Sequence, residues 1–159
     1  AMTTDIIVGF PGESENDFQQ TCQVVKQIGF SKTHLFPFSP RRGTDAALLK
    51  DQVPKPIKTE RMRQLQQIEI ATSSQYFQSL LGTTLEVLVE QESPLKQQLG
   101  RRESEPESNA GPKQALLRGT ACRYAPVQFV GETGTLGQIQ KVRVSKLVNG
   151  TLMGTLTHR

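Results

Sequence analysis

The sequence contains no tryptophan, only two cysteines and no apolar stretch long enough to cross a membrane. Cys22 and Cys122 lie far apart, so their spacing indicates neither a disulfide framework nor a metal site. Two reduced thiols in a cytoplasmic protein are the simplest interpretation, and no secretory signal pattern argues against it. Without tryptophan, the hydrophobic core has to be built from leucine, isoleucine, valine and a few phenylalanines.

Neither sign of charge dominates the sequence. Its 159 residues include 19 Lys and Arg against 15 Asp and Glu, a formal net charge of +4 with a pI near 9.3. This mild excess permits an anionic partner such as RNA but does not require one. The length suits one large domain or two small ones. Because Ala1–Thr4 leads directly into the apolar run Ile6–Val8, we expect the sequence to be cut from a longer protein.

The first third of the sequence predicts a strand, a helix and a second strand. Residues 5–10 form a short apolar run, typical of a strand buried on both faces of a parallel sheet. A helix should then begin after Ser14, which forms a weak capping box with Asp17, and end at Gly29. Residues 34–38 predict the second strand, which completes a βαβ unit.

A loop and a long helix should follow. Residues 39–52 contain the loop-forming run Pro40-Arg41-Arg42-Gly43. Pro54 and Pro56 are typical of a helix start, and the helix should extend to about residue 80 or 81 and end at Gly82. Because most of its surface is polar, it should lie across the outside of a sheet.

The pattern changes to short strands after Gly82. Leu85, Val87 and Val89 alternate with polar residues, as in a half-buried strand. Residues 92–113 contain almost nothing apolar and predict a flexible insertion. Four more strands are expected at 116–122, 126–130, 138–147 and 151–157, the last two joined by a hairpin turn at Asn149-Gly150. Five short strands without a helix indicate a small barrel of the OB type. We therefore expect two domains, 1–82 and 83–159.

The ends of the two predicted parallel strands carry the first candidate site, because ligands bind at the carboxyl ends of such strands. The first end is Gly9-Phe10-Pro11-Gly12, where glycines would let the backbone approach a ligand closely. A plain strand-to-helix turn would explain the same residues. The second end is Phe36-Pro37-Phe38, where one ring could stack on an adenine or both could belong to the core.

Basic residues in the second half make the second candidate site. Residues 83–159 hold ten Lys and Arg against seven Asp and Glu, and most of the acids lie in the first strand and the insertion. Alternation places Lys141 and Arg143 on one face, opposite the valines, and Lys146 on the valine face. The full set predicted to contact RNA is Arg118, Arg123, Tyr124, Lys141, Arg143 and Lys146. Tyr124 beside a cation suits base stacking, although a solvated barrel surface and a packed tyrosine are the alternatives.

Together these segments resemble the tRNA methylthiotransferases of the radical-SAM superfamily. The resemblance rests on Thr3–Phe18, which contains Ile-Val-Gly-Phe-Pro-Gly-Glu, on Ser39–Thr44, and more loosely on Leu117–Val127 and Leu152–Leu156. The last two segments are similar to the family's TRAM domain. Within the family, residues 29–39, Asp51–Pro54, Lys58 and Arg61 look most like the branch that acts on threonylcarbamoyladenosine. The isopentenyladenosine branch comes second and a ribosomal-protein-modifying branch third.

The resemblance implies the C-terminal part of a radical-SAM partial TIM barrel (βαβα) followed by a five-stranded OB-like TRAM barrel that binds tRNA. In such an enzyme a [4Fe–4S] cluster on a C-x-x-x-C-x-x-C triad cleaves S-adenosylmethionine, and a second [4Fe–4S] cluster helps deliver sulfur. The product carries a methylthio group on the adenine next to the anticodon. Gly9–Gly12 would lie near the S-adenosylmethionine, and Phe36–Phe38 near its adenine. With no cysteine triad here, we expect no bound cluster and no activity from this chain alone.

Two other functions are compatible with the residues. The chain could be a stand-alone RNA-binding module whose βαβ part is only a scaffold. It could also be an interaction protein that pairs an exposed sheet edge with another chain, and a dimer through that edge is possible.

Overall fold

The structure, a computed structural model, describes residues 1–94 and 114–157. The chain divides into two compact units, Ala1–Tyr76 and Phe77–Arg159, which we call the first and second units. The predicted insertion at 92–113 begins too early, because residues 92–94 belong to a strand, and its remainder lies outside the described residues. None of the described helices is both long and apolar enough to span a membrane.

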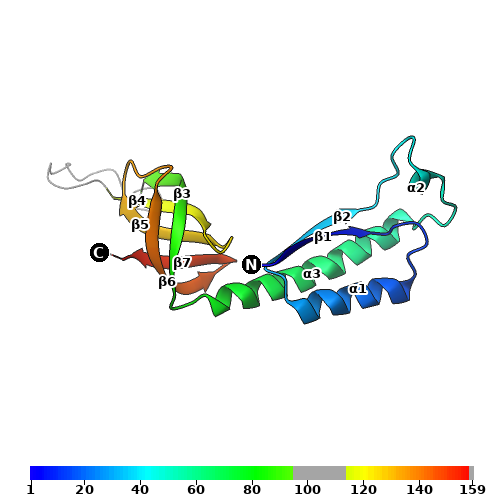
Figure 1. The fold of residues 1–159 in the computed structure, drawn as a ribbon, viewed down its shortest axis with the longest axis horizontal. Coiled ribbons are helices and arrows are strands. Elements are labelled where there is room, and N and C mark those ends of the chain that lie inside the picture. Colours follow the sequence, from blue (N-terminus) through cyan, green and yellow to red (C-terminus); the bar gives the residue numbers. More distant parts are fainter. Residues whose placement is uncertain (95–113, 158–159) are drawn as a thin grey trace, which may run out of the picture. The chain divides into compact units, whose positions relative to one another are not determined.

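The first unit contains two parallel strands and three helices (Figure 1). Strand β1 (Thr3–Val8) pairs in parallel with β2 (Lys32–Pro37), and Ile7 lies opposite Phe36. Helix α1 (Glu15–Ile28) connects the two strands, which confirms the predicted βαβ order. The short helix α2 (Asp45–Leu48) interrupts the predicted loop, and α3 (Lys55–Ser79) ends slightly before the predicted position.

Local sequence signals set the ends of α1. The Ser14 hydroxyl accepts a hydrogen bond from the Asp17 N–H, and the Asp17 carboxylate accepts one from the Ser14 N–H, so the capping box is complete. Gly29 ends the helix in the left-handed conformation, with φ of 66°, and its N–H donates to the carbonyl oxygen of Val25. Both predictions are confirmed.

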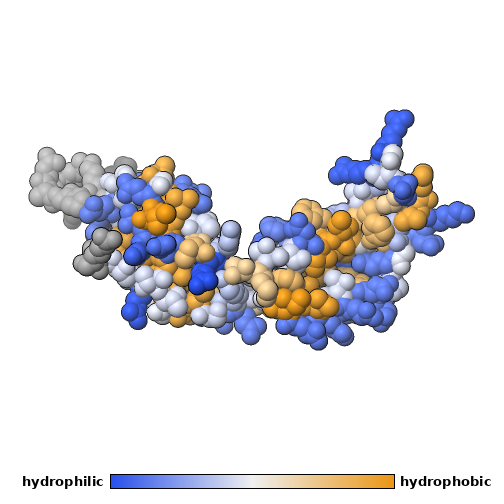
Figure 2. Space-filling model, viewed as in Figure 1, coloured by the Kyte–Doolittle hydropathy of each residue, from blue (hydrophilic) through white to orange (hydrophobic). Residues whose placement is uncertain are grey.

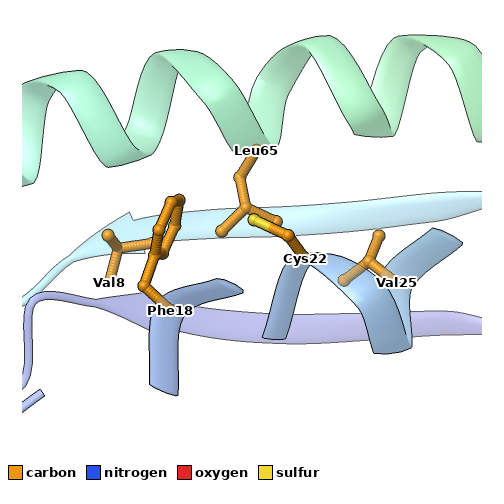
Figure 3. Close-up of a cluster of buried hydrophobic side chains, with 5 residues drawn as sticks. All are labelled: Val8, Phe18, Cys22, Val25 and Leu65. Carbon is orange, nitrogen blue, oxygen red and sulfur yellow. The ribbon is translucent and has the colours of Figure 1, made fainter. Parts of the chain in front are cut away.

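The core of the first unit lies on one face of the two-stranded sheet. Side chains from β1, α1 and α3 meet there: Val8, Phe18, Cys22, Val25 and Leu65 (Figure 3). On the opposite face Ile7 is 56% exposed and Phe36 is 50% exposed. The prediction of a strand buried on both faces is therefore wrong for the described residues, because both long helices pack on the same face. Hydrophobic surface is visible over β1 and β2 in Figure 2.

The second unit is a closed barrel of five strands in the order β3-β4-β5-β7-β6. The strands are β3 (Thr84–Pro94), β4 (Gln114–Ala121), β5 (Pro126–Glu132), β6 (Ile139–Val148) and β7 (Thr151–Leu156). This closure confirms the predicted five-stranded barrel. Its core consists of the alternating apolar residues, among them Leu85, Val87 and Val89 of β3, all at most 4% exposed.

Two features of the barrel show why particular residues are needed. Asn149 and Gly150 have φ angles of 48° and 75°, the combination that a two-residue hairpin turn between β6 and β7 requires. Gly119 lies so close to β3 that an added Cβ would come within 1.8 Å of the Leu88 carbonyl oxygen. A glycine is therefore needed where β4 crosses the irregular part of β3.

Candidate cofactor and RNA sites

The two strand ends of the first unit lie next to each other, as the parallel pairing predicts. The Phe38 N–H donates to the Val8 carbonyl oxygen at 2.7 Å, which continues the ladder one residue past β2. The rings of Phe10 and Phe38 then pack edge to face, with centroids 5.1 Å apart and planes at 70°. Phe10 is 44% exposed, so an aromatic surface remains open beside the strand ends.

Arg61 of α3 lies behind this surface and is almost completely buried. Its Nη1 donates to Glu13 Oε2 at 2.6 Å and to the Glu13 carbonyl oxygen at 3.1 Å. Its Nη2 donates to Glu15 Oε2 at 3.2 Å, and its guanidinium carbon lies 5.2 Å from the centre of the Phe18 ring. The same Glu13 Oε2 accepts the Gly9 N–H at 2.8 Å, so the loop after β1 is tied to α3.

Lys58, one helical turn before Arg61, ties the second strand end to α3. Its Nζ donates to the Phe38 carbonyl oxygen at 2.9 Å and lies 5.9 Å from the centre of the Phe38 ring. Its aliphatic stem packs on Gly9, where an added Cβ would lie 2.3 Å from Lys58 Cγ. Gly9 is also in the left-handed region, with φ of 75°.

These contacts show which of the residues predicted to bind a cofactor remain open to solvent. Gly9 is buried and its N–H is bonded to Glu13, and its lack of a side chain makes room for the stem of Lys58. Gly12 is exposed, but its N–H donates to the Asp51 carbonyl oxygen at 2.8 Å. Pro11 and Phe38 are partly buried. The residues that remain open to solvent at the strand ends are Phe10, Gly12, Phe36 and Pro37.

The cysteines do not form a metal site. Cys22 is 4% exposed in the core of the first unit, where burial raises the pKa of its thiol. Cys122 is exposed and lies in the second unit. Within the ranges 1–94 and 114–157, no three His, Cys, Asp or Glu side chains are grouped as metal ligands. These side chains therefore do not fit an iron–sulfur cluster.

The outer face of β6 carries three exposed cations, Lys141, Arg143 and Lys146. The alternation predicted for the first two is confirmed, because Val142 and Val144 between and after them are fully buried. The placement of Lys146 on the valine face is wrong. A bulge between Val144 and Lys146 shifts the register, so that Lys146 pairs with the partly exposed Met153 and not with a core residue.

The strand register shows what surrounds these cations. Arg143 lies between Thr84 of β3 and Thr155 of β7, so neither of its cross-strand partners is acidic. Lys141 lies opposite Glu86 of β3. Arg118 comes from β4, and its Nη2 lies 3.3 Å from Thr151 Oγ1 at the start of β7. We call Arg118, Lys141, Arg143 and Lys146 the basic face.

Arg123 and Tyr124 lie in the turn between β4 and β5. The Tyr124 N–H donates to the Ala121 carbonyl oxygen at 2.8 Å, and the tyrosine adopts a φ of 56°. Its side chain is 74% exposed, which excludes the alternative that it packs in the core. The turn leads into Val127, which pairs with Leu152, the neighbour of Thr151. The turn and the Arg118 guanidinium therefore lie at the same end of the barrel.

Comparisons with known proteins identify relatives over nearly the whole chain. A tRNA-2-methylthio-N(6)-dimethylallyladenosine synthase from Desulfitobacterium hafniense is 37% identical over 97% of the chain. The synthases of the same name from Aquifex aeolicus and Geobacillus kaustophilus are 37% and 34% identical over 98% and 99%. The chain belongs to the family of these tRNA methylthiotransferases. No family model matches the sequence.

The matched part is a fraction of each methylthiotransferase relative. The chain spans 31% of the length of the first two relatives and 27% of the third. The names of these relatives refer to dimethylallyladenosine, which corresponds to the isopentenyladenosine branch that the sequence motifs ranked second, after the threonylcarbamoyladenosine branch.

Sequence reasoning missed the roles of three residues in this chain. In the sequence, Glu13 stood out only as the last residue of the motif Ile-Val-Gly-Phe-Pro-Gly-Glu. Lys58 and Arg61 were used only to distinguish branches of the family. A signal was present, since Lys58 and Arg61 are spaced one helical turn apart and so lie on one face of α3. What the spacing could not reveal is that this face meets both strand ends.

Proposed function

We propose that this chain is part of a radical-SAM enzyme that adds a methylthio group to the modified adenosine next to the anticodon of tRNA. The family relationship over nearly the whole chain is the observation that carries the proposal. The names of the relatives make N(6)-dimethylallyladenosine the preferred nucleoside. The first unit would contribute to the wall of the S-adenosylmethionine site, and the barrel, as a TRAM domain, would bind the tRNA.

The open sheet face of the first unit supports a place in a larger barrel. Helices cover one face of β1 and β2, while Ile7 and Phe36 are about half exposed on the other. In a TIM barrel the helices lie outside and the opposite sheet face lines a packed interior. Within residues 1–94 and 114–157, no third strand joins this sheet. Additional strands from a longer protein would extend it into the C-terminal part of a partial TIM barrel.

The exposed strand-end side chains fit S-adenosylmethionine in one respect. Phe10 and Phe36 offer open aromatic and apolar surface where parallel strands end, which suits an adenine ring. When bound and reduced by an iron–sulfur cluster, S-adenosylmethionine supplies a carbon radical. The two cysteines do not fit either cluster, so residues outside this chain would have to bind both. Here the chain's own residues would only bind and orient the nucleoside part.

The basic face is the surface that we assign to tRNA. Lys141, Arg143 and Lys146 follow one strand, and the Arg118 side chain reaches the adjoining hairpin. The neighbouring strand β3 instead exposes Glu86 and Glu90, which would repel phosphates. The charges thus favour β6 over β3 as the strand that contacts the phosphate backbone. Tyr124 would add a stacking surface at the end of the barrel.

Binding of a dimethylallyladenosine-containing anticodon stem-loop at several salt concentrations tests this assignment. Reversing two charges of the basic face (Lys141→Glu with Arg143→Glu) should abolish salt-dependent binding. Reversing two charges of the first unit (Lys26→Glu with Lys55→Glu) is the matched control and should leave binding unchanged. Equal binding by both double variants would refute the assignment. Mass spectrometry of nucleosides made by the full-length enzyme tests the methylthio transfer itself.

The second candidate function is a stand-alone RNA-binding module with a non-catalytic α/β scaffold. The same basic face supports it, because that face lies wholly in the second unit. The gene distinguishes the two functions. An upstream reading frame with a C-x-x-x-C-x-x-C triad favours the enzyme, and a start of translation at Met2 favours the module.

A further inference from the structure

Arg61 is an unusual residue for its position, because it is charged but only 5% exposed. Burying a guanidinium has a large desolvation cost, and a buried ion pair often stabilises a protein no more than apolar residues of the same size would. Arg61 nevertheless makes three hydrogen bonds to Glu13 and Glu15. Stability alone is therefore a weak explanation for this ion pair, and the position of its partners suggests another.

Glu13 links Arg61 to the loop that follows β1. A single carboxylate oxygen, Oε2, accepts both Arg61 Nη1 at 2.6 Å and the Gly9 N–H at 2.8 Å. The Glu13 N–H in turn donates to the Phe10 carbonyl oxygen at 2.9 Å. The loop is thus closed at both ends by one residue, and Arg61 holds that residue in place. Phe10 lies inside the closed loop, so these hydrogen bonds hold its backbone.

Lys58 completes the arrangement from the same side of α3. It donates to the Phe38 carbonyl oxygen, and Phe38 packs edge to face on Phe10. One turn of α3 therefore fixes the loops after both strands, and with them the relative orientation of the two rings.

We infer that Arg61 is a positioning residue for the nucleoside part of S-adenosylmethionine. It acts through Glu13 and Gly9 and sets the orientation of the exposed Phe10 ring without touching the cofactor. The inference rests on the proposed function, since it takes the strand ends as the cofactor site. It adds a requirement to that function: binding of S-adenosylmethionine should depend on a buried side chain in the third helix, behind the loop.

Equilibrium dialysis of S-adenosylmethionine against the full-length protein tests the inference. Arg61→Met keeps an apolar side chain of similar length but leaves the largely buried Glu13 carboxylate without its cation, so it should melt below wild type, and binding is measured well below its melting temperature. In the folded variant, the Kd for S-adenosylmethionine should rise at least tenfold and tRNA affinity should be unchanged. Arg61→Lys keeps the charge but cannot bridge two acceptors in the same way. Its Kd for S-adenosylmethionine should therefore lie between those of wild type and Arg61→Met. If Arg61→Met does not fold, Arg61→Lys and Glu13→Gln provide the same comparison.

Two further measurements separate positioning from a general loss of structure. Hydrogen exchange of the peptide that contains Gly9 and Phe10 should be faster in Arg61→Met, with or without S-adenosylmethionine. Arg63→Met is the matched control, because Arg63 is exposed on the same helix and pairs locally with Glu60. It should change neither Kd nor exchange. An unchanged Kd in a folded Arg61→Met protein would overturn the inference alone. A wild-type protein that binds no S-adenosylmethionine would overturn the proposed function and the inference together.

Discussion

A Cβ added at Gly154 of β7 would lie only 2.5 Å from the carbonyl oxygen of Arg143 on β6. The same atom would lie 2.6 Å from Val142 Cγ1 in the barrel core. Gly154→Ala should therefore push the two strands apart and lower the free energy of unfolding by roughly 1–3 kcal/mol, the usual cost of overpacking. Because Arg143 moves with its backbone, tRNA affinity should also fall. Thermal melting and tRNA binding measure the two effects.

Gly150→Asn is the matched control for this glycine. Gly150 has φ of 75° but open space around it, and asparagine tolerates the left-handed region. It should melt close to wild type. A Gly154→Ala protein as stable as wild type would show that β6 and β7 can move apart without lowering the free energy of unfolding.

The pairing of Glu86 with Lys141 should weaken tRNA binding in the native protein. Glu86 lies opposite Lys141 in the register and repels nearby phosphates. Glu86→Gln should therefore tighten tRNA binding, whereas Lys141→Ala should weaken it. Each lost phosphate contact should reduce the slope of log K against log salt by about 0.7–0.9. Glu60→Gln in the first unit is the control, and a salt slope unaffected by Lys141→Ala would argue against a phosphate contact there.

The barrel could be predicted from sequence because its signals are local. Apolar alternation marked the buried faces, and Asn149-Gly150 marked the hairpin that the structure contains. Lys146 was misplaced for the same reason. A bulge changes the alternation, but no residue type in the sequence marks its position. The shift is seen only in the structure, where Lys146 pairs with Met153.

The arrangement behind the strand ends could not be predicted, because it depends on contacts across long sequence separations. Arg61 meets Glu13, and Lys58 meets Phe38, only after α3 packs on the sheet. Spacing alone gave Gly9 a role in approaching a ligand. The contact of the Lys58 stem with Gly9 is seen only in the structure. Periodicity predicts which face of a helix is buried, but not which loop that face will meet.

Tyr124 should contribute to RNA binding without contributing to stability. Its side chain is 74% exposed and its φ of 56° is unfavourable for a residue with a side chain. Tyr124→Gly should therefore melt at or slightly above the wild-type temperature. It should also lose the stacking free energy of one base, about 1–3 kcal/mol in tRNA binding. Tyr124→Phe keeps the ring and should bind almost as wild type. If Tyr124→Phe bound as weakly as Tyr124→Gly, the hydroxyl would be the contact and stacking would be excluded.

The capping box of α1 should make the first unit sensitive to acid. Hydrogen bonds from the Ser14 hydroxyl and N–H lower the pKa of Asp17 below its ordinary value of 3.8. A depressed pKa contributes stability above the unfolded value, and this contribution is lost as the pH falls from 3.8 through the lower, folded-state pKa. Ser14→Ala should therefore make the melting temperature less dependent on pH below about 4. Ser73→Ala, which removes a local hydrogen bond to the Ile70 carbonyl oxygen within α3, should leave the pH dependence unchanged.

The two cysteines should differ sharply in reactivity, and the difference reports on the proposed RNA surface. Cys22 is buried and its thiol pKa is raised, so it should react with a thiol reagent only when the first unit unfolds. Cys122 is exposed and lies directly before Arg123 and Tyr124, so it should react at once in the native protein. Bound tRNA that contacts this turn should slow the reaction of Cys122, as followed by mass spectrometry of the labelled peptides. The Lys141→Glu, Arg143→Glu double variant should lose this protection. Full reactivity of Cys122 in a saturated tRNA complex would place the RNA away from the turn and remove Tyr124 from the interface.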